Sequence, residues 1–520
     1  MRIKAALVFL FLSVFLLGPA LGQQKDELSL TLEDAILKAL KNNLDLAVSI
    51  YSPEIAGASL SQAREYFMPS LQLSYGNQKN ESPPYWFIQG ASTIVDRFRD
   101  YGASIVQQIP TGGNVSVSVD SYRSDTNQAF QLINPRYGST LRLDFNQPLL
   151  RNFGSKVSRQ QILIAQNNLD ISESQLKSAL LNTIYLVEEA YWNYVYAIES
   201  YKVAQQSLKL GQDLLRKNQK EVEVGQLAQI EVLNAQATVA AREADLIQAE
   251  GVMRRSEEVL KSVINLAAET DAQNKSLVPV DKPEFKAVTI SREESLKEAL
   301  AKRPDLQITE KGIETNQLNM SVAKNQTLPG LDLKFSYWSP GISGDRLLYL
   351  DNDPFLGIII GKEPGGASKS IRDALRFLYQ NWTVGLTLTL PLSNFVSRAH
   401  YALAKLQVQQ SLAQLKTQEQ QAALEVSDAI TTIETNAKRV SATRIARELA
   451  EKRLEAEEKK LQVGLTTNYF VLQYQDELAT ARSQEIKSVI EYNLALARLE
   501  KATGTALENR NIKLSQFTAK

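Results

Sequence analysis

Residue types that carry most enzymatic and metal chemistry are scarce in this chain of 520 residues. It contains no cysteine, and His400 is its one histidine. A thiol nucleophile, a disulfide framework and a cysteine metal site are therefore excluded, and several histidines cannot cluster within one chain. No nucleophile-elbow motif is present, which disfavours a secreted hydrolase. The formal charge is zero, so charge provides no argument for a nucleic-acid partner.

Two glycine turns are the most informative motifs. Val224-Gly225-Gln226-Leu227 and Val463-Gly464-Leu465-Thr466 each interrupt a long proline-free stretch rich in helix-forming residues. Glycine allows the left-handed backbone that a tight turn requires. Corresponding features of the two stretches lie about 240 residues apart, which indicates a tandem repeat of one supersecondary unit.

Each stretch predicts a long antiparallel helical hairpin. The second has a seven-residue apolar repeat, interrupted once by Arg447, at Val426, Ile433, Val440, Leu454 and Leu461. Such a repeat keeps one seam of a helix facing a partner helix. A helical arm over residues 395–461 would be about 100 Å long, at roughly 1.5 Å per residue. The hairpins are expected at about 155–268, turning at Gly225, and at about 395–503, turning at Gly464.

The N-terminus has the pattern of a secretory signal peptide, residues 1–22. Arg2 and Lys4 precede an apolar run, and small residues at Ala20 and Gly22 favour cleavage before Gln23. A membrane anchor is the alternative, but the run is short for a span. The mature chain is expected to be exported without a helical membrane span.

The remaining sequence divides into repeat 1, residues 23–282, and repeat 2, residues 283–520. Each begins with short helices, at about 28–65 and 291–327. After Pro69 and Pro329 the apolar period changes from helical to two. Strands are predicted at about 69–78, 138–149, 329–338 and 381–392.

Each predicted strand has one apolar and one polar face. The apolar face could pack on a soluble core, or it could face lipid while the polar face lines water. Polar-face candidates, which mix both charges, are Arg142, Asp144, Asp332 and Lys334. Four strands cannot close a barrel, and open edges are not tolerated in lipid. A membrane location would therefore require several chains to share one barrel.

Two segments extend beyond the predicted strands. Residues 101–109 and 115–122 flank Thr111-Gly112-Gly113, which is a hairpin signal, and residues 339–380 form a long second-repeat segment. Both are expected as exposed loops above the strands, and whether the hairpin joins the sheet stays open. An aromatic band on the first long helix favours helix packing over a ligand-stacking platform: Tyr185, Tyr191, Trp192, Tyr194, Tyr196 and Tyr201.

The order of these motifs, repeated twice along the chain, resembles the pattern of the TolC-like family of outer-membrane efflux proteins. The resemblance covers nearly the whole mature chain. It rests on Leu30 to Ala35, the junction at Pro69, Gln147-Pro148-Leu149-Leu150, Glu189-Ala190-Tyr191-Trp192 and the two glycine turns.

The resemblance implies a mainly α fold with a membrane β-barrel part. Three chains would share a twelve-stranded β-barrel in outer-membrane lipid and a long α-helical barrel in the periplasm. The function implied is a passive exit duct of a tripartite efflux or type I secretion system, without cofactor or catalytic residues. The helical turns would meet a periplasmic adaptor protein, which links the duct to an inner-membrane pump. The implied adaptor contacts are Val224, Gly225, Leu227, Val463, Gly464, Leu465 and Thr466.

One feature departs from the family pattern. Many members narrow the tip with aspartates just after the second turn, where this chain has Phe470 and Gln473. The first-repeat positions are Glu231 and Asn234. We hypothesise that these four residues lie at or near the narrowest ring of the pore. The alternative function is a periplasmic coiled-coil adaptor or scaffold without a pore, which two hairpins bracketed by alternating strands disfavour.

Overall fold

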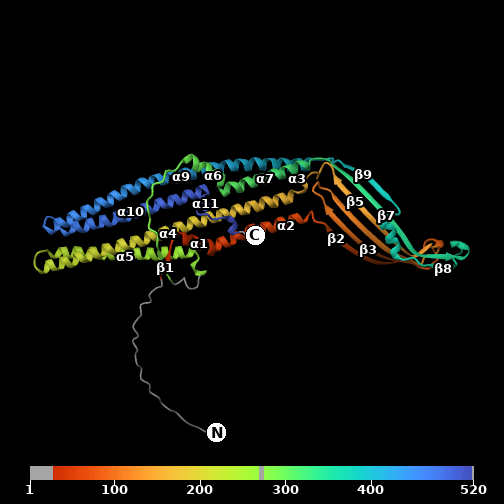
Figure 1. Cartoon of the computed structure of the whole chain (residues 1–520), viewed down its shortest axis with the longest axis horizontal. Coiled ribbons are helices and arrows are strands. Elements are labelled where there is room, and N and C mark those ends of the chain that lie inside the picture. The colour runs from red at the N-terminus through yellow and green to blue at the C-terminus, as the bar shows by residue number, and fades with distance from the viewer. Residues whose placement is uncertain (1–26, 269–274, 518–520) are drawn as a thin grey trace, which may run out of the picture. The chain divides into compact units, whose positions relative to one another are not determined.

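The structure is a computed structural model that describes residues 27–268 and 275–517 (Figure 1). The predicted signal peptide lies outside these residues. The chain forms two compact units. The first unit contains Asp428–Lys501 and the described parts of Met1–Ala47 and Asn182–Ile290, and the second contains Val48–Leu181, Ser291–Ser427 and the described part of Ala502–Lys520. Within the described ranges, none of the helices combines the length and apolar character that a membrane crossing requires.

The first unit holds the turning ends of two helical hairpins. Helix α4 (Gln160–Glu223) is followed by α5 (Gln229–Val263), and α9 (Phe395–Gln462) by α10 (Asn468–Thr503). The predicted seam of α9 is buried: Val440 is 0% and Ile433 3% exposed. Near the turn, Leu454 packs with Val471 and Leu478 of α10. The seven-residue repeat therefore marks the face that α9 presents to its partner.

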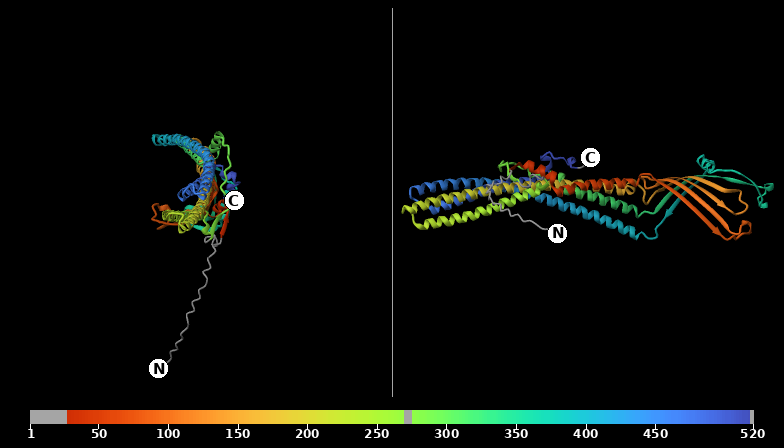
Figure 2. Two further views of the ribbon diagram at one scale, coloured as in Figure 1. Left: turned by 90° about the vertical axis from the view of Figure 1, so that its left-hand side faces the viewer. Right: turned by 90° about the horizontal axis from the view of Figure 1, so that it is seen from below.

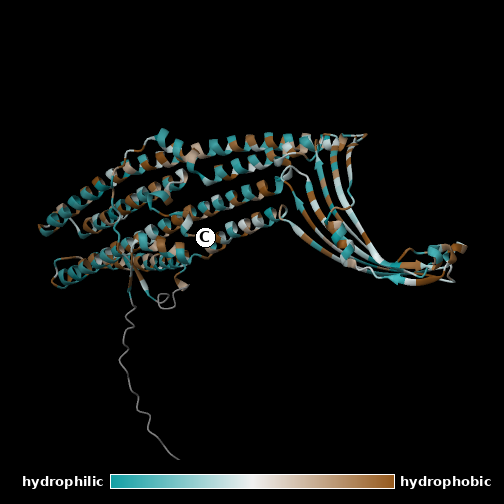
Figure 3. Ribbon diagram, turned by 45° about the vertical axis from the view of Figure 1, so that its right-hand side comes forward, coloured by the Kyte–Doolittle hydropathy of each residue, from teal (hydrophilic) through white to brown (hydrophobic). Residues whose placement is uncertain are grey.

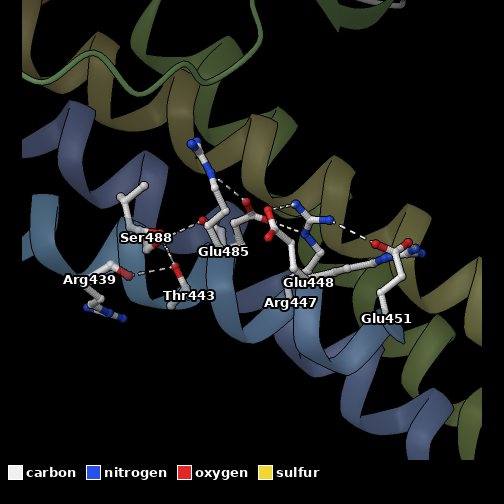
Figure 4. Close-up of polar contacts among 10 residues, drawn as sticks. Arg439, Thr443, Arg447, Glu448, Glu451, Glu485 and Ser488 are labelled. Carbon is white, nitrogen blue, oxygen red and sulfur yellow. Dashed lines mark hydrogen bonds and ion pairs between the residues drawn. The ribbon is translucent and has the colours of Figure 1, made fainter. Parts of the chain in front are cut away.

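Arg447 interrupts the repeat because it pairs with charges on both helices of the hairpin. Its Nε donates to Glu485 of α10 at 2.9 Å, and its Nη1 donates to Glu451 at 3.1 Å (Figure 4). One turn away, the hydroxyls of Thr443 and Ser488 are 2.8 Å apart. The long arginine side chain reaches the edge of the seam, where its guanidinium stays partly solvated.

Three aromatic residues of α4 pack in the interior of the first unit. Tyr191, Trp192 and Tyr194 are buried beside a parallel pair of strands, β1 (Glu27–Leu30) and β6 (Ser276–Pro279). The Tyr191 hydroxyl donates to Asp281 at 2.8 Å, and that of Tyr194 to the Leu277 carbonyl at 2.7 Å. Burial raises the pKa of both phenols. The burial of these three residues favours a packing role over a ligand-stacking platform, and Tyr191 and Tyr194 bond to β6 and the residues after it rather than to another helix.

The helices that open the two repeats have matching N-caps. Helix α1 (Leu32–Asn42) is capped by Thr31, which accepts from Asp34 N at 3.1 Å, and α6 (Arg292–Lys302) by Ser291 in the same way. Helices α2 (Leu44–Glu65) and α7 (Pro304–Asn325) follow them. The shorter helices are α3 (Ser155–Ser158), α8 (Ala367–Leu375) and α11 (Ala506–Asn509).

The second unit contains an antiparallel sheet. Its strands are β2 (Ser70–Ser82), β3 (Ile94–Gln108), β4 (Asn114–Thr126), β5 (Ile133–Pro148), β7 (Gly330–Tyr349), β8 (Ile359–Glu363) and β9 (Asn381–Thr389). The order is β2-β3-β4-β5-β7, with β9 and the short β8 both on the far side of β7. Figure 1 shows β2 and β9 at opposite sides of the sheet, and Figure 2 gives a second view of the strands.

The expected count of four strands was too low, and the 101–122 hairpin is not an exposed loop above the strands. Strands β3 and β4 lie between β2 and β5 and pair along their whole length. Their connecting turn is at the end of the sheet where β5 leads into the helices: Gly154 N donates to Thr111 O at 3.0 Å. The 339–380 segment is also partly ordered, because it contains the end of β7, β8 and α8.

The sheet has two chemically distinct faces, visible in Figure 3 as alternating colours along the strands. One register row crosses all six long strands on the apolar face: Leu71, Ile105, Val117, Leu143, Tyr337 and Trp382. The next row lies on the polar face: Gln72, Ser104, Ser118, Arg142, Trp338 and Asn381. Helix α8 packs on the apolar face, where the hydroxyls of Ser370 and Ser139 are 2.9 Å apart.

Candidate functional site

The two glycine turns have the same backbone geometry. In the first, Gly225 has φ +75°, Gln226 N donates to Glu221 O at 2.8 Å, and Gly225 N donates to Val222 O at 3.0 Å. This 6→1 and 5→2 pair of bonds defines the Schellman helix ending. In the second, Gly464 has φ +76°, and Leu465 N donates to Lys460 O at 2.9 Å. A β-carbon at either glycine would meet open space, so the backbone angle alone requires glycine.

The turns expose apolar side chains. Val224 is 68%, Val463 69% and Leu465 77% exposed. Leu227 and Thr466 are half-buried, and the Thr466 hydroxyl donates to Glu457 at 2.5 Å. This hydrogen bond lowers the pKa of the Glu457 carboxyl. The predicted contact residues thus combine a defined backbone shape with apolar side chains accessible to a partner.

A buried amide pair links the two hairpins next to the turns. Asn468, the first residue of α10, donates to Asn218 of α4 at 2.7 Å. Asn218 is 0% exposed, and its own amide donates to the Glu231 carbonyl at 3.4 Å. The sequence analysis did not single out these asparagines. A polar residue at a position that should be apolar is the signal that could have identified them.

Arg242 of α5 forms a second, larger link. Its guanidinium donates to the Ser207 carbonyl of α4 at 2.9 Å, to Gln475 at 3.1 Å and to Asp476 at 2.8 Å. A further bond reaches the Leu472 carbonyl at 3.2 Å. The residue is 4% exposed, and the Asp476 side chain is largely solvated. Arg242 therefore joins α4, α5 and α10 through one buried cation.

The four candidate pore-constriction residues lie in the first turns of the helices that follow the glycines. Phe470 is 43% exposed, and Gln473, three residues later on α10, is also exposed. Glu231 of α5 is half-buried and Asn234 is exposed. Residues three apart share a helix face, so Phe470 and Gln473 present one common surface. Their position at the narrowest ring of a pore stays a prediction.

The four candidate lumen residues occupy one face of β5 and β7. The Ser336 hydroxyl donates to Asp144 at 2.6 Å, and the Arg142 guanidinium lies 5.2 Å from the Trp338 ring centre. Lys334 pairs in register with Asn146, and Asp332 with Pro148. Residues on the same face that the sequence analysis missed are Asp96, Asp100 and Asp120 of β3 and β4. Extending the alternation through residues 94–126 would have found them.

With the fold established, the chain can be compared with known proteins. The family described as outer membrane efflux protein matches residues 114–266 and 295–505, and the chain belongs to this family. The resemblance, the fold class and the outer-membrane location expected from the sequence are thereby confirmed, and the chain serves efflux across that membrane. The family consists of channels rather than enzymes. No curated protein sequence matches the chain.

Solved structures of outer-membrane channels share the fold. The outer-membrane channel OprN is similar with a TM-score of 0.63 at 17% identity, covering 91% of this chain and 90% of that one. CmeC of Campylobacter jejuni has a TM-score of 0.62 at 16% identity, covering 93% and 90%. The open state of MtrE of Neisseria gonorrhoeae has a TM-score of 0.60 at 18% identity, covering 92% and 89%.

Proposed function

We propose that three copies of this chain form a passive exit duct through the outer membrane, and that its helical turns dock a periplasmic adaptor protein. The observation that carries this proposal is the two-faced sheet, whose edge strands β2 and β9 each have one side without a partner strand within the described residues. An inner-membrane pump would supply the energy through the adaptor. The duct itself needs only a water-lined passage and a docking surface.

The apolar face of the sheet suits lipid. Leu73 of β2 is 72% exposed and Leu386 of β9 is 67% exposed. Aqueous exposure of each such side chain costs about 1.5–3 kcal/mol relative to burial. A transmembrane strand needs about 9–11 residues, and the six long strands meet or exceed the lower limit. The polar face, with Arg142 and Asp144, would then line the aqueous passage.

The paired turns suit a partner built from repeated helical hairpins. Each chain offers two Schellman turns with exposed valines, so three chains would offer six similar turns in a ring. An adaptor hairpin could bury Val463 and Leu465 against its own apolar tip. This surface is small, which suits a contact repeated around a ring, where avidity increases the total affinity.

The adaptor contact is tested by Leu465→Asp. Burying an unpaired carboxylate at a protein contact is strongly unfavourable, so this variant should lose most adaptor capture. Ile445→Asp is the matched control, because Ile445 is an exposed apolar residue of α9, the helix that precedes the turn; it is 58% accessible and lies away from the turn. Both variants should reach the outer membrane as trimers on a mild gel. Equal adaptor capture by the two variants would refute the contact.

The exit duct as a whole is tested by gene deletion and fractionation. Deletion should increase accumulation of an efflux dye, and the wild-type chain should restore export. Recovery of the chain as a periplasmic, non-trimeric protein would instead support the adaptor or scaffold alternative. That alternative leaves the exposed apolar sheet face and both unpaired sheet edges without an explanation.

A further inference from the structure

We infer that the membrane barrel of this protein has eighteen strands, closed by pairing β9 of each copy with β2 of the next. This inference rests on the trimer of the proposed function. Each copy contributes six long strands, namely β2, β3, β4, β5, β7 and β9, and three times six is eighteen. Among the described strands, the short β8 pairs with residues 346–349 of β7 alone, so it is left out of the count. The four-strand expectation would have led to twelve.

The extra hairpin, β3–β4, belongs to the barrel wall because it continues both faces of the sheet. On the apolar face, Leu71 pairs with Ile105, which pairs with Val117, which pairs with Leu143. This row carries no polar residue between β2 and β5. A hairpin folded away from the sheet would instead leave β2 and β5 to pair directly with each other.

The turn of this hairpin is anchored at the helical end of the sheet. The Thr111 hydroxyl donates to Gln147 at 2.6 Å, and the Gln147 amide donates back to the Thr111 carbonyl at 3.2 Å. A β-carbon on Gly112 would clash with the Asn152 carbonyl, so the turn packs against the segment after β5. Short turns on the periplasmic side and longer loops outside are typical of outer-membrane barrels. The hairpin follows this pattern.

Strand direction permits closure between copies. Every neighbouring pair in the sheet is antiparallel, so β2 and β9, first and last of an even number of strands, run in opposite directions. When β9 of one copy meets β2 of the next, the pair is antiparallel and the alternation continues around the ring. An odd number of strands per copy would force parallel contacts. Six strands cannot close alone, because the smallest outer-membrane barrels have about eight.

The two edges also match chemically. In β2 the apolar residues are Leu71, Leu73 and Tyr75, and in β9 they are Trp382, Val384, Leu386 and Leu388. These side chains are 55–72% exposed, compared with 49% for Ile105 of β3 and 39% for Val117 of β4 on the same face. Unpaired backbone N–H and C=O groups are not tolerated in lipid. Edge pairing satisfies these groups and makes the apolar band continuous.

The register between copies is restricted by the two faces. Since side chains alternate, odd-numbered residues of β2 must lie opposite even-numbered residues of β9 on the apolar face. On the polar face, Gln72 and its neighbours must lie opposite Thr383, Gly385 or Thr387. Barrel diameter grows roughly in proportion to strand number, so this barrel would be about 1.5 times as wide as one of twelve strands. Asp100 and Asp120 on β3 and β4 would add carboxylates to its lumen.

Cysteine pairs test the closure directly, because the native chain has no cysteine. Gln72→Cys is combined with Thr383→Cys or Thr387→Cys, and the same series is made with Ser70→Cys and Ser74→Cys. At least one polar-face combination should give covalent dimers and trimers on oxidation of the outer-membrane protein. The matched control is Gln72→Cys with Leu386→Cys, whose side chains point to opposite faces and should give at least tenfold less product.

A density map of the purified protein counts the strands independently. The expected result is a ring of eighteen strands in which β3 and β4 are lipid-facing members. A trimer whose ring has twelve strands, with β3–β4 outside it, would overturn the inference while leaving the proposed function intact. A trimer without cross-links in any polar-face combination would also overturn it. A protein that is not a trimer before oxidation would show instead that the proposed function fails.

Discussion

The buried guanidinium of Arg242 provides the sharpest test of how the two hairpins are held together near their turns. We predict that Arg242→Met loosens α5 from α10. Methionine fills a similar volume but donates no hydrogen bond. The substitution removes all the bonds from α5 to Ser207 O, Leu472 O, Gln475 and Asp476.

The size of the expected destabilisation follows from which polar groups remain buried without a partner. Gln475 is 7% exposed and would lose a donor, and the Leu472 carbonyl would lose one of its bonds. Each buried polar group left unsatisfied costs about 1–3 kcal/mol. Asp476 is largely solvated, so its lost ion pair adds about 0–1 kcal/mol at most. The local opening free energy should therefore fall by about 2–4 kcal/mol.

Hydrogen exchange measured by mass spectrometry reports the local opening free energy of α5 and α10 directly. Each 1.4 kcal/mol of opening free energy is about tenfold in exchange rate, so amides near residue 242 of α5 and 475 of α10 should exchange about 30-fold to 700-fold faster. Arg254→Met is the control, since Arg254 lies on the same helix in an exposed pair with Glu250. Similar exchange in the two variants would refute the role assigned to the buried link.

Three further predictions concern the turns and the pore. Phe470→Ala should raise single-channel conductance in a planar bilayer, whereas Tyr469→Ala, the neighbouring exposed aromatic, should leave it unchanged; the reverse order would exclude Phe470 from the constriction. Gly464→Ala should destabilise the second turn by about 1 kcal/mol, because the φ of Gly464 is +76°. Gly251→Ala, the control within α5, should stabilise its helix by about 0.5–1 kcal/mol. Thermal unfolding measures both changes in stability, and a change in the same direction for the two variants would contradict the backbone argument. Arg142→Gln should shift ion selectivity toward cations if this residue lines the lumen, and unchanged reversal potentials would place it elsewhere.

Sequence patterns correctly predicted the features that depend on residues close together in the chain: the helix seam, the glycine turns and the strand faces. The repeat through Ile433 and Val440 identified the buried seam of α9, because helix period and packing face are properties of one segment. Glycine in both turns predicted the positive φ that Gly225 and Gly464 adopt. Alternation in residues 141–145 assigned Arg142 and Asp144 to one face for the same reason.

Contacts between distant segments could not be predicted in this way. Residues 94–126 contained a hairpin signal, but charged residues away from the turn, such as Asp96 and Arg99, gave no indication that β3 and β4 extend so far. Whether a hairpin enters a sheet depends on its pairing with β2 and β5, which no local period reports. Arg242 was overlooked because its partners Leu472, Gln475 and Asp476 are more than 200 residues away.

The amino-acid sequence by itself determined that this chain repeats one unit of paired helices and two-faced strands, and that it has too little histidine and cysteine for most catalytic or metal sites. Side-chain period and backbone angles are local, so they can be derived from residue order. Only the tertiary structure decided how many strands form the sheet and which buried polar groups join the hairpins. The strand count and the buried polar links both depend on which backbone and side-chain groups are removed from water, and that is decided only when distant segments of the chain pack together.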